Sequence, residues 1–191
     1  MLKKPRADTI CFKKEVHMEL KGKKAMILVE QMYNDYEFIY PYYRLLESGA
    51  ETYVVGPEAD KKYPGKEGTQ ASSNLSAAQA DPQAFSVMVI PGGYAPDHMR
   101  RHRAMVDLVR EMYGQGKIIA AICHAGWLPA SAGILKGKKM TSFFAIKDDL
   151  IHAGAQWVDE EVVVDGNLIT SRTPDDLPAF MRTVIARTRE L

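Results

Sequence analysis

Three short, unbroken apolar runs constrain the fold of this chain more than any other feature of its sequence. They cover residues 25–29, 87–90 and 118–122, and each ends abruptly at a polar or glycine-bearing segment. A strand with one solvated face alternates apolar and polar residues, whereas a continuous apolar run is typical of a strand buried on both faces. The runs therefore predict a parallel sheet that is covered by helices.

Helical patterns alternate with these runs. Residues 37–48 follow the N-cap candidates Asn34 and Asp35, place apolar side chains on one face and stop at Gly49. Further helices are expected at residues 103–113, 126–132 and 148–153, and a last helix opens at Thr173-Pro174. The alternation of strand and helix predicts one α/β sandwich with a mostly parallel central sheet.

Weaker signals complete the expected sheet. Residues 51–55 predict a strand, and shorter strands are expected near residues 69–75 and 141–144. Residues 162–164 and 168–170 predict a hairpin around Asp165-Gly166, a pair that favours a type I′ turn.

Charge is unevenly distributed along the chain. The formal net charge is +1, which argues against a dedicated nucleic-acid-binding protein. Residues 1–24, however, hold eight basic and three acidic side chains. We expect residues 1–22 to form a basic, poorly ordered extension, with a nucleic-acid or membrane arm as the alternative. Residues 23–191 then form the domain.

No apolar run is long enough to span a membrane, and the start of the chain lacks the apolar segment of a secretory signal. A cytoplasmic protein with no membrane partner is therefore expected. The two cysteines, Cys11 and Cys123, do not suggest a disulfide framework, so at least one free thiol is expected.

Candidate reactive residues follow three of the predicted strands, and ligands bind at the carboxyl ends of such strands. Cys123 lies at a strand-to-helix turn, which can expose a nucleophile and lower the pKa of its thiol. His124 could act as its base, and the Gly92-Gly93 backbone could approach a reacting carbonyl. Glu37 lies at a helix start. The alternatives are an inert buried cysteine, a histidine that only lines the crevice, a tight turn and a helix-dipole carboxylate.

A metal site is a further possibility near Asp97, His98 and His102, because histidines four residues apart share a helix face. Arginines at positions 100, 101 and 103 surround them and disfavour a bound cation. We expect no metal and no other cofactor.

Five blocks of the sequence together resemble the PfpI family of intracellular cysteine peptidase-like proteins. This family is related to the parkinsonism-associated deglycase and to class I glutamine amidotransferases. The blocks are residues 37–45, 89–96, 121–124, 146–149 and 162–167, and the resemblance covers about residues 23–191.

The resemblance implies a flavodoxin-like three-layer sandwich and a nucleophilic Cys123 with Glu37 beside its sulfur. It implies an oxyanion hole built from Gly93 and the backbone N–H of His124. In peptidase-type members, histidine is the base and a carboxylate from a neighbouring subunit orients it; the matching position here is Asp97. A homo-oligomer (dimer, trimer or hexamer) with the site near an interface is therefore expected.

The expected substrate pocket includes Tyr94 and Trp127. The sequence Ala125-Gly126-Trp127 departs from the Gly-Pro that often follows the family's histidine, and Trp127 is expected to narrow the pocket. The leading hypothesis is a cysteine-dependent hydrolase that attacks the carbonyl of a peptide or small molecule. The alternatives are a glyoxalase or deglycase that acts on methylglyoxal or glycated groups, a non-enzymatic stress chaperone or redox sensor, and an amidase subunit.

Overall fold

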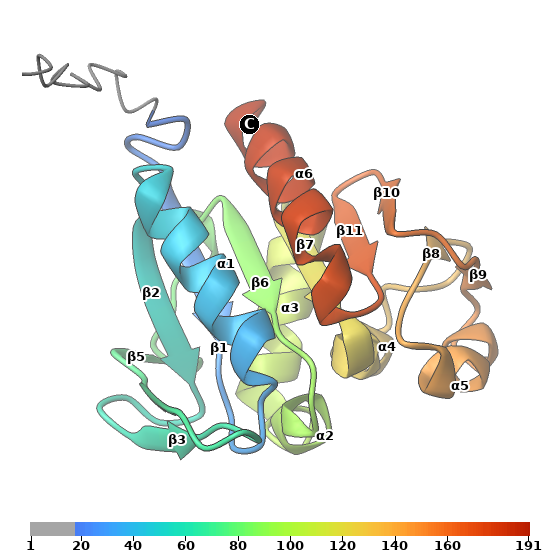
Figure 1. Cartoon of the computed structure of the whole chain (residues 1–191), viewed down its shortest axis with the longest axis horizontal. Coiled ribbons are helices and arrows are strands. Elements are labelled where there is room, and N and C mark those ends of the chain that lie inside the picture. The colour runs from blue at the N-terminus through green and yellow to red at the C-terminus, as the bar shows by residue number, and fades with distance from the viewer. Residues whose placement is uncertain (1–17) are drawn as a thin grey trace, which may run out of the picture.

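The computed structural model describes residues 18–191 as a central sheet with helices on both faces (Figure 1). The sheet has seven strands in the order β10-β11-β7-β6-β1-β2-β5. Their bounds are β1 (Lys24–Leu28), β2 (Glu51–Gly56), β5 (Leu75–Ser76), β6 (Val87–Ile90), β7 (Ile118–Ile122), β10 (Val162–Asp165) and β11 (Leu168–Ser171). Every neighbouring pair is parallel except β10 and β11. The predicted α/β sandwich is confirmed.

The helices form the two outer layers. Their bounds are α1 (Asp35–Glu47), α2 (Ala95–Met99), α3 (Arg103–Gly114), α4 (Trp127–Ser131), α5 (Lys147–His152) and α6 (Leu177–Arg189). Helices α1 and α6 pack together on one face of the sheet, and α3 covers the other face and contacts α4 (Figure 1). Two small pairings lie outside the main sheet: β3 (Lys62–Pro64) with β4 (Gln70–Ser72), and β8 (Lys139–Met140) with β9 (Gln156–Trp157).

The apolar runs form the centre of the sheet as predicted. Strands β6 and β7 are buried along their whole length, and β1 is buried from its second residue onward. Helix α1 begins at Asp35, two residues before the predicted start, because the Asn34 side chain accepts the N–H groups of Tyr36 and Glu37 at 3.1 and 3.3 Å.

Three local predictions need correction. Residues 141–144 do not form a strand: the strand β8 ends at Met140, and Phe144–Ile146 is a 3-10 turn. The segment 69–75 contains parts of two separate strands, β4 and β5. In the hairpin, Asp165 pairs with Leu168, so the turn is centred on Gly166-Asn167. Only the first of these two residues has a positive φ, as in a type II′ turn.

The expected N-terminal extension is described only from residue 18 onward, and residues 1–17, Cys11 included, lie outside the described residues. Within residues 18–22 the structure differs from the expected disorder. Leu20 is fully buried in the core, and its backbone N–H donates to the carbonyl of Ser48 at 2.8 Å. Packing therefore begins before the domain boundary predicted at residue 23.

None of the helices between residues 18 and 191 combines the length and the apolar character needed to cross a membrane.

Candidate active site

The candidate site lies where three neighbouring strands of the sheet, β1, β6 and β7, reach their carboxyl ends. Glu37 is in the first turn of α1, which follows β1. Gly92 and Gly93 follow β6, and Cys123 and His124 follow β7. The parallel arrangement brings these residues to one edge of the sheet from positions far apart in the sequence, as predicted.

Cys123 has a left-handed backbone with φ of 61°. Such a conformation is uncommon for a residue with a side chain, and it is found in the sharp turns that expose catalytic nucleophiles. A 3-10 turn, Cys123–Gly126, leads directly into α4. Cys123 is nevertheless only 7% exposed, so a substrate must enter a crevice to reach it.

Glu37 is the most deeply buried acidic side chain of the described residues, with no exposed surface. Its Oε2 accepts the backbone N–H of Gly92 at 2.7 Å, and its Oε1 is buried without a hydrogen-bond partner. A Cβ at position 92 would lie 2.6 Å from Glu37 Oε2 and 2.7 Å from Cys123 Cβ, so glycine is what permits this close approach. Burial raises the pKa of Glu37 to about 7, against the lowering effect of the Gly92 N–H and the Cys123 thiol.

The thiol does not have the lowered pKa expected from its place at a helix start. Burial, and next the charge of Glu37, raise the pKa of Cys123 to about 12. The backbone N–H groups of His124 and Gly93 lower the pKa of the thiol, but they do not outweigh burial. Glu37 and Cys123 therefore form a coupled pair that loses its first proton near neutrality.

The predicted oxyanion donors lie together beside the sulfur. Gly93 and His124 line the same crevice as Cys123, and their N–H groups lower the pKa of its thiol, so they are the candidate donors to an oxygen on a carbon bonded to Sγ. Gly93 has φ of 73°, and a Cβ there would lie 2.4 Å from the carbonyl oxygen of Met32 and 2.6 Å from the amide nitrogen of Asn34. Only glycine fits this position without moving the main chain.

His124 contacts its sequence neighbour through the turn. Its Nδ1 lies 3.2 Å from Cys123 Sγ, a pairing that a regular helix would not allow. Burial, and then the charge of Lys66, lower the pKa of His124, so the ring is neutral near pH 7 and able to accept a proton.

Asp97 does not contact His124 within the described chain. It lies on α2, forms an ion pair with Arg101, and faces a hollow that also borders Trp127, Asp149 and His152. The other residues weighed as metal ligands are also apart, since His102 bonds to Glu30 at 3.0 Å. Between residues 18 and 191, no three histidine, cysteine or acidic side chains are grouped so that they could hold a metal ion.

The crevice above Cys123 has a volume of about 420 Å³. Tyr94 lines it as predicted, whereas Trp127 lies outside it and borders the neighbouring hollow near Asp97. The remaining lining residues are Asn34, Lys66, Gly93, His124, Phe143, Thr173 and Pro174.

Sequence reasoning missed Lys66, Phe143 and Thr173. Lys66 reaches the site because Asp35, beside Glu37, anchors the loop that carries it. The Asp35 carboxylate accepts the backbone N–H groups of Glu67 and Thr69 at 2.7 and 2.9 Å. The glycines on either side of Lys66-Glu67 were a signal for this tight loop, but they did not indicate where it lies.

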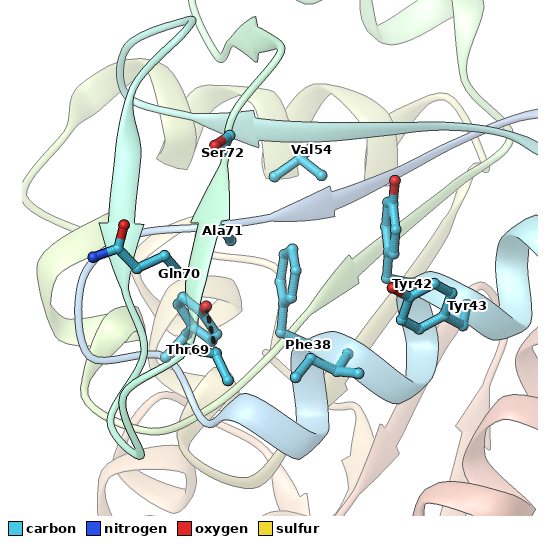
Figure 2. A pocket seen from close by; sticks show the side chains of 10 residues that line it. Phe38, Tyr42, Tyr43, Val54, Thr69, Gln70, Ala71 and Ser72 are labelled. Atoms are coloured by element: carbon cyan, nitrogen blue, oxygen red, sulfur yellow. Dashed lines mark hydrogen bonds between the residues drawn. The ribbon is translucent and has the colours of Figure 1, made fainter.

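A second hollow of about 400 Å³ lies between α1 and β4 (Figure 2). Aromatic side chains, Phe38 and Tyr42 among them, line it, and the Tyr33 hydroxyl bonds to Thr69 at 2.9 Å. It holds no thiol, imidazole or carboxylate. This second hollow therefore offers no nucleophile or base, unlike the Cys123 crevice.

Comparison with known proteins identifies the family of this chain. The model of the DJ-1/PfpI family matches residues 23–187. The chain belongs to the DJ-1/PfpI family. A relative from Pyrococcus furiosus, named deglycase PfpI, is 43% identical over 162 residues, which cover 85% of this chain and 97% of the relative. Protein/nucleic acid deglycase 2 of Escherichia coli is 37% identical over 166 residues, or 86% of this chain and 96% of the relative.

Solved structures show the same fold. The crystal structure of Drosophila melanogaster DJ-1beta has a TM-score of 0.82 and 30% identity, and covers 88% of this chain and 91% of that one. The resemblance found in the sequence is therefore confirmed, and so is the flavodoxin-like α/β class that it implied.

Proposed function

We propose that this chain is a cysteine-dependent enzyme that acts on small carbonyl compounds, as a glyoxalase or deglycase. The observation that carries the proposal is the convergence at one crevice of a thiol, an imidazole 3.2 Å from its sulfur, a buried carboxyl and the backbone of Gly93. The two relatives described above are named deglycases, which favours this choice over the peptidase-like hydrolase of the leading sequence hypothesis, although a 36% identical relative from Bacillus subtilis is named a putative cysteine protease.

The first step is addition of the thiol to an aldehyde carbon. The sulfur–carbon bond forms, the thiol proton passes to Glu37 or His124, and the carbonyl oxygen gains the negative charge. The N–H groups of Gly93 and His124 stabilise that charge. Return of the proton to the oxygen completes a hemithioacetal.

With a dicarbonyl such as methylglyoxal, the next step moves a proton between neighbouring carbons. Glu37 or His124 removes the proton from the former aldehyde carbon and returns it to the adjacent carbonyl carbon, while the hydroxyl proton passes from the first oxygen to the second. The product is a thioester, which water hydrolyses to a hydroxy acid and the free thiol. One dicarbonyl and one water give one hydroxy acid, so no external oxidant is needed.

The size of the crevice favours a small substrate. A volume of about 420 Å³ above Cys123, which is 7% exposed, accommodates an aldehyde or a glycated side chain more readily than an extended peptide. Peptide cleavage also calls for a carboxylate that orients His124, and Asp97 is held by Arg101 within its own chain. We propose that the peptidase reaction, if present, depends on a homo-oligomer in which Asp97 of one subunit serves another.

The redox-sensor alternative fits this site less well. Oxidation by peroxide proceeds through the thiolate, and the raised pKa of Cys123 keeps the resting thiol protonated. Peptide-resolved mass spectrometry after mild peroxide treatment tests this alternative. Selective sulfinic acid at Cys123 in a protein without turnover would favour the sensor.

The decisive experiment compares loss of methylglyoxal, formation of lactate and peptide cleavage in the full chain, Cys123→Ala and Glu37→Gln. Asp148→Ala, at an exposed position of α5, is the control. We expect lactate formation in the full chain and the control, a loss of at least a hundredfold in Cys123→Ala, and little peptide cleavage. Full lactate formation by Cys123→Ala would overturn the proposal, as would an inactive full chain.

A further inference from the structure

The imidazole of His124 lies between two aromatic rings of its own chain. The Phe143 ring stacks on it with centroids 5.0 Å apart and an interplanar angle of 27°. The Trp127 ring meets it edge-on, with centroids 5.3 Å apart and an angle of 63°. Both arrangements are favourable for aromatic pairs, so together they restrict how the imidazole can rotate.

The Trp127 ring is itself fixed from outside the crevice. Its Nε1–H donates to Asp149 Oδ2 at 2.7 Å, and the guanidinium of Arg100 lies 5.8 Å from its centroid. Trp127 begins α4, Asp149 lies in the first turn of α5, and Arg100 follows α2. Three helices therefore determine the orientation of one indole.

A histidine that takes a proton from a thiol needs a group that holds its ring in place. In many nucleophilic sites that group is a carboxylate bonded to the second ring nitrogen. No acidic side chain of residues 18–191 makes such a bond to His124, and Asp97 is paired with Arg101. Among the described residues of one chain, the ring contacts with Phe143 and Trp127 are what restrict the imidazole, whose Nδ1 lies 3.2 Å from Sγ.

We propose that Trp127 and Asp149 are positioning residues for His124. Asp149 holds the indole, the indole and Phe143 hold the imidazole, and the imidazole keeps Nδ1 directed at the sulfur. Within one chain, a carboxylate thus acts on the histidine through an aromatic ring. The catalytic consequence rests on the proposed function, whereas the geometry can be tested without turnover.

The activity test separates positioning from substrate binding. Because Trp127 does not line the crevice over Cys123, its loss should change kcat more than KM. With methylglyoxal we expect Trp127→Leu and Asp149→Ala to lower kcat about tenfold and to change KM less than about twofold. Asp149→Asn keeps an oxygen acceptor for the indole and should retain most of kcat. Asp148→Ala, one residue away on α5, is the matched control.

The second test observes the imidazole of His124 directly, by NMR of the Cys123→Ser variant. The imidazole C–H resonances of His124, assigned by their loss in His124→Gln, should be displaced by ring currents from Trp127 and Phe143. We expect Asp149→Ala to move them toward the position of an exposed histidine, while Asp149→Asn and Asp148→Ala leave them in place.

The activity test and the NMR test contradict different parts of the proposal. His124 resonances that do not move in Asp149→Ala would overturn the positioning role, whatever the turnover. A KM increase without loss of kcat would also overturn it, because it would make Trp127 a binding residue. A full chain that turns over no carbonyl substrate would overturn the proposed function, and the NMR result would still decide the role of Asp149.

Discussion

The carboxylate of Glu37 accepts the backbone N–H of Gly92 at 2.7 Å, and this bond joins the segments that follow β1 and β6. The contact is fully buried, and the second carboxylate oxygen has no hydrogen-bond partner. A charged group in such a place reduces stability, so its presence there is better explained by chemistry than by folding.

The first prediction concerns stability and pH. Burial raises the pKa of Glu37 from 4.5 to about 7 in the folded chain. Between these two values the folded state binds more protons than the unfolded state, so the free energy of unfolding falls as pH rises. The contribution of Glu37 to the free energy of unfolding should therefore be on the order of 3 kcal/mol smaller above pH 7 than below pH 4.5.

Urea unfolding of Glu37→Gln at pH 5 and pH 8 tests this. The amide can still accept the Gly92 N–H and carries no charge, so the variant should gain stability relative to the wild type as pH rises. Exposed Glu161→Gln should show no such trend. A wild type that becomes more stable than Glu37→Gln at pH 8 would contradict the prediction.

The second prediction concerns thiol reactivity. Because Glu37 and Cys123 lose their first proton as a pair, the fraction of thiolate should rise through the pKa of about 7 and then level off. Iodoacetamide labelling of the Cys123 peptide, followed by mass spectrometry from pH 5 to pH 10, should show this bend. Glu37→Gln should lose it, and an identical profile in both proteins would exclude the coupling.

The third prediction separates backbone strain from steric overlap. Gly93 and Gly116 have nearly the same φ, 73° and 75°, but only Gly93 faces main-chain atoms within 3 Å of an added Cβ. Gly116→Ala should reduce the free energy of unfolding by about 1 kcal/mol. Gly93→Ala should reduce it by about 1–3 kcal/mol more and abolish activity. Equal reductions of the free energy of unfolding in the two variants, measured by chemical denaturation, would refute the close packing at Gly93.

The fourth prediction concerns the start of the domain. Leu20 is fully buried, whereas Met18 is 53% exposed. Leu20→Ala should reduce the free energy of unfolding by about 2–5 kcal/mol, and Met18→Ala by less than about 1 kcal/mol. Removal of residues 1–22 should lower the melting temperature below that of the chain without residues 1–17, because only the longer deletion removes Leu20. Equal melting temperatures for the two truncations would show that Leu20 packing is dispensable.

The sheet could be predicted because a continuous apolar run is typical of a strand that is buried on both faces. Cys123, His124 and Gly93 could be predicted because they follow those runs, and parallel strands bring their carboxyl ends together. The expected strand at residues 141–144 was wrong because an apolar pair, Phe143-Phe144, suggests a strand when its partners are unknown. Phe143 instead stacks on His124.

Local sequence patterns could not predict the contacts between loops that are distant in the sequence. Lys66 reaches the crevice only because Asp35 anchors its loop, and no periodicity links the two residues. The thiol pKa was predicted in the wrong direction for a related reason. The helix start beside Cys123 is visible in the sequence, but the burial of the thiol and its proximity to Glu37 depend on the whole fold.

The strand order also has a consequence for synthesis of the chain. Strands β1, β2, β5 and β6 can pair as soon as they leave the ribosome, but β6 then has an open edge until β7 is made. That edge, Val87–Ile90, is entirely apolar, and open apolar edges pair readily with other chains. A polypeptide that stalls shortly after residue 90 therefore presents an aggregation-prone strand, and completion of β7 both covers that edge and delivers Cys123.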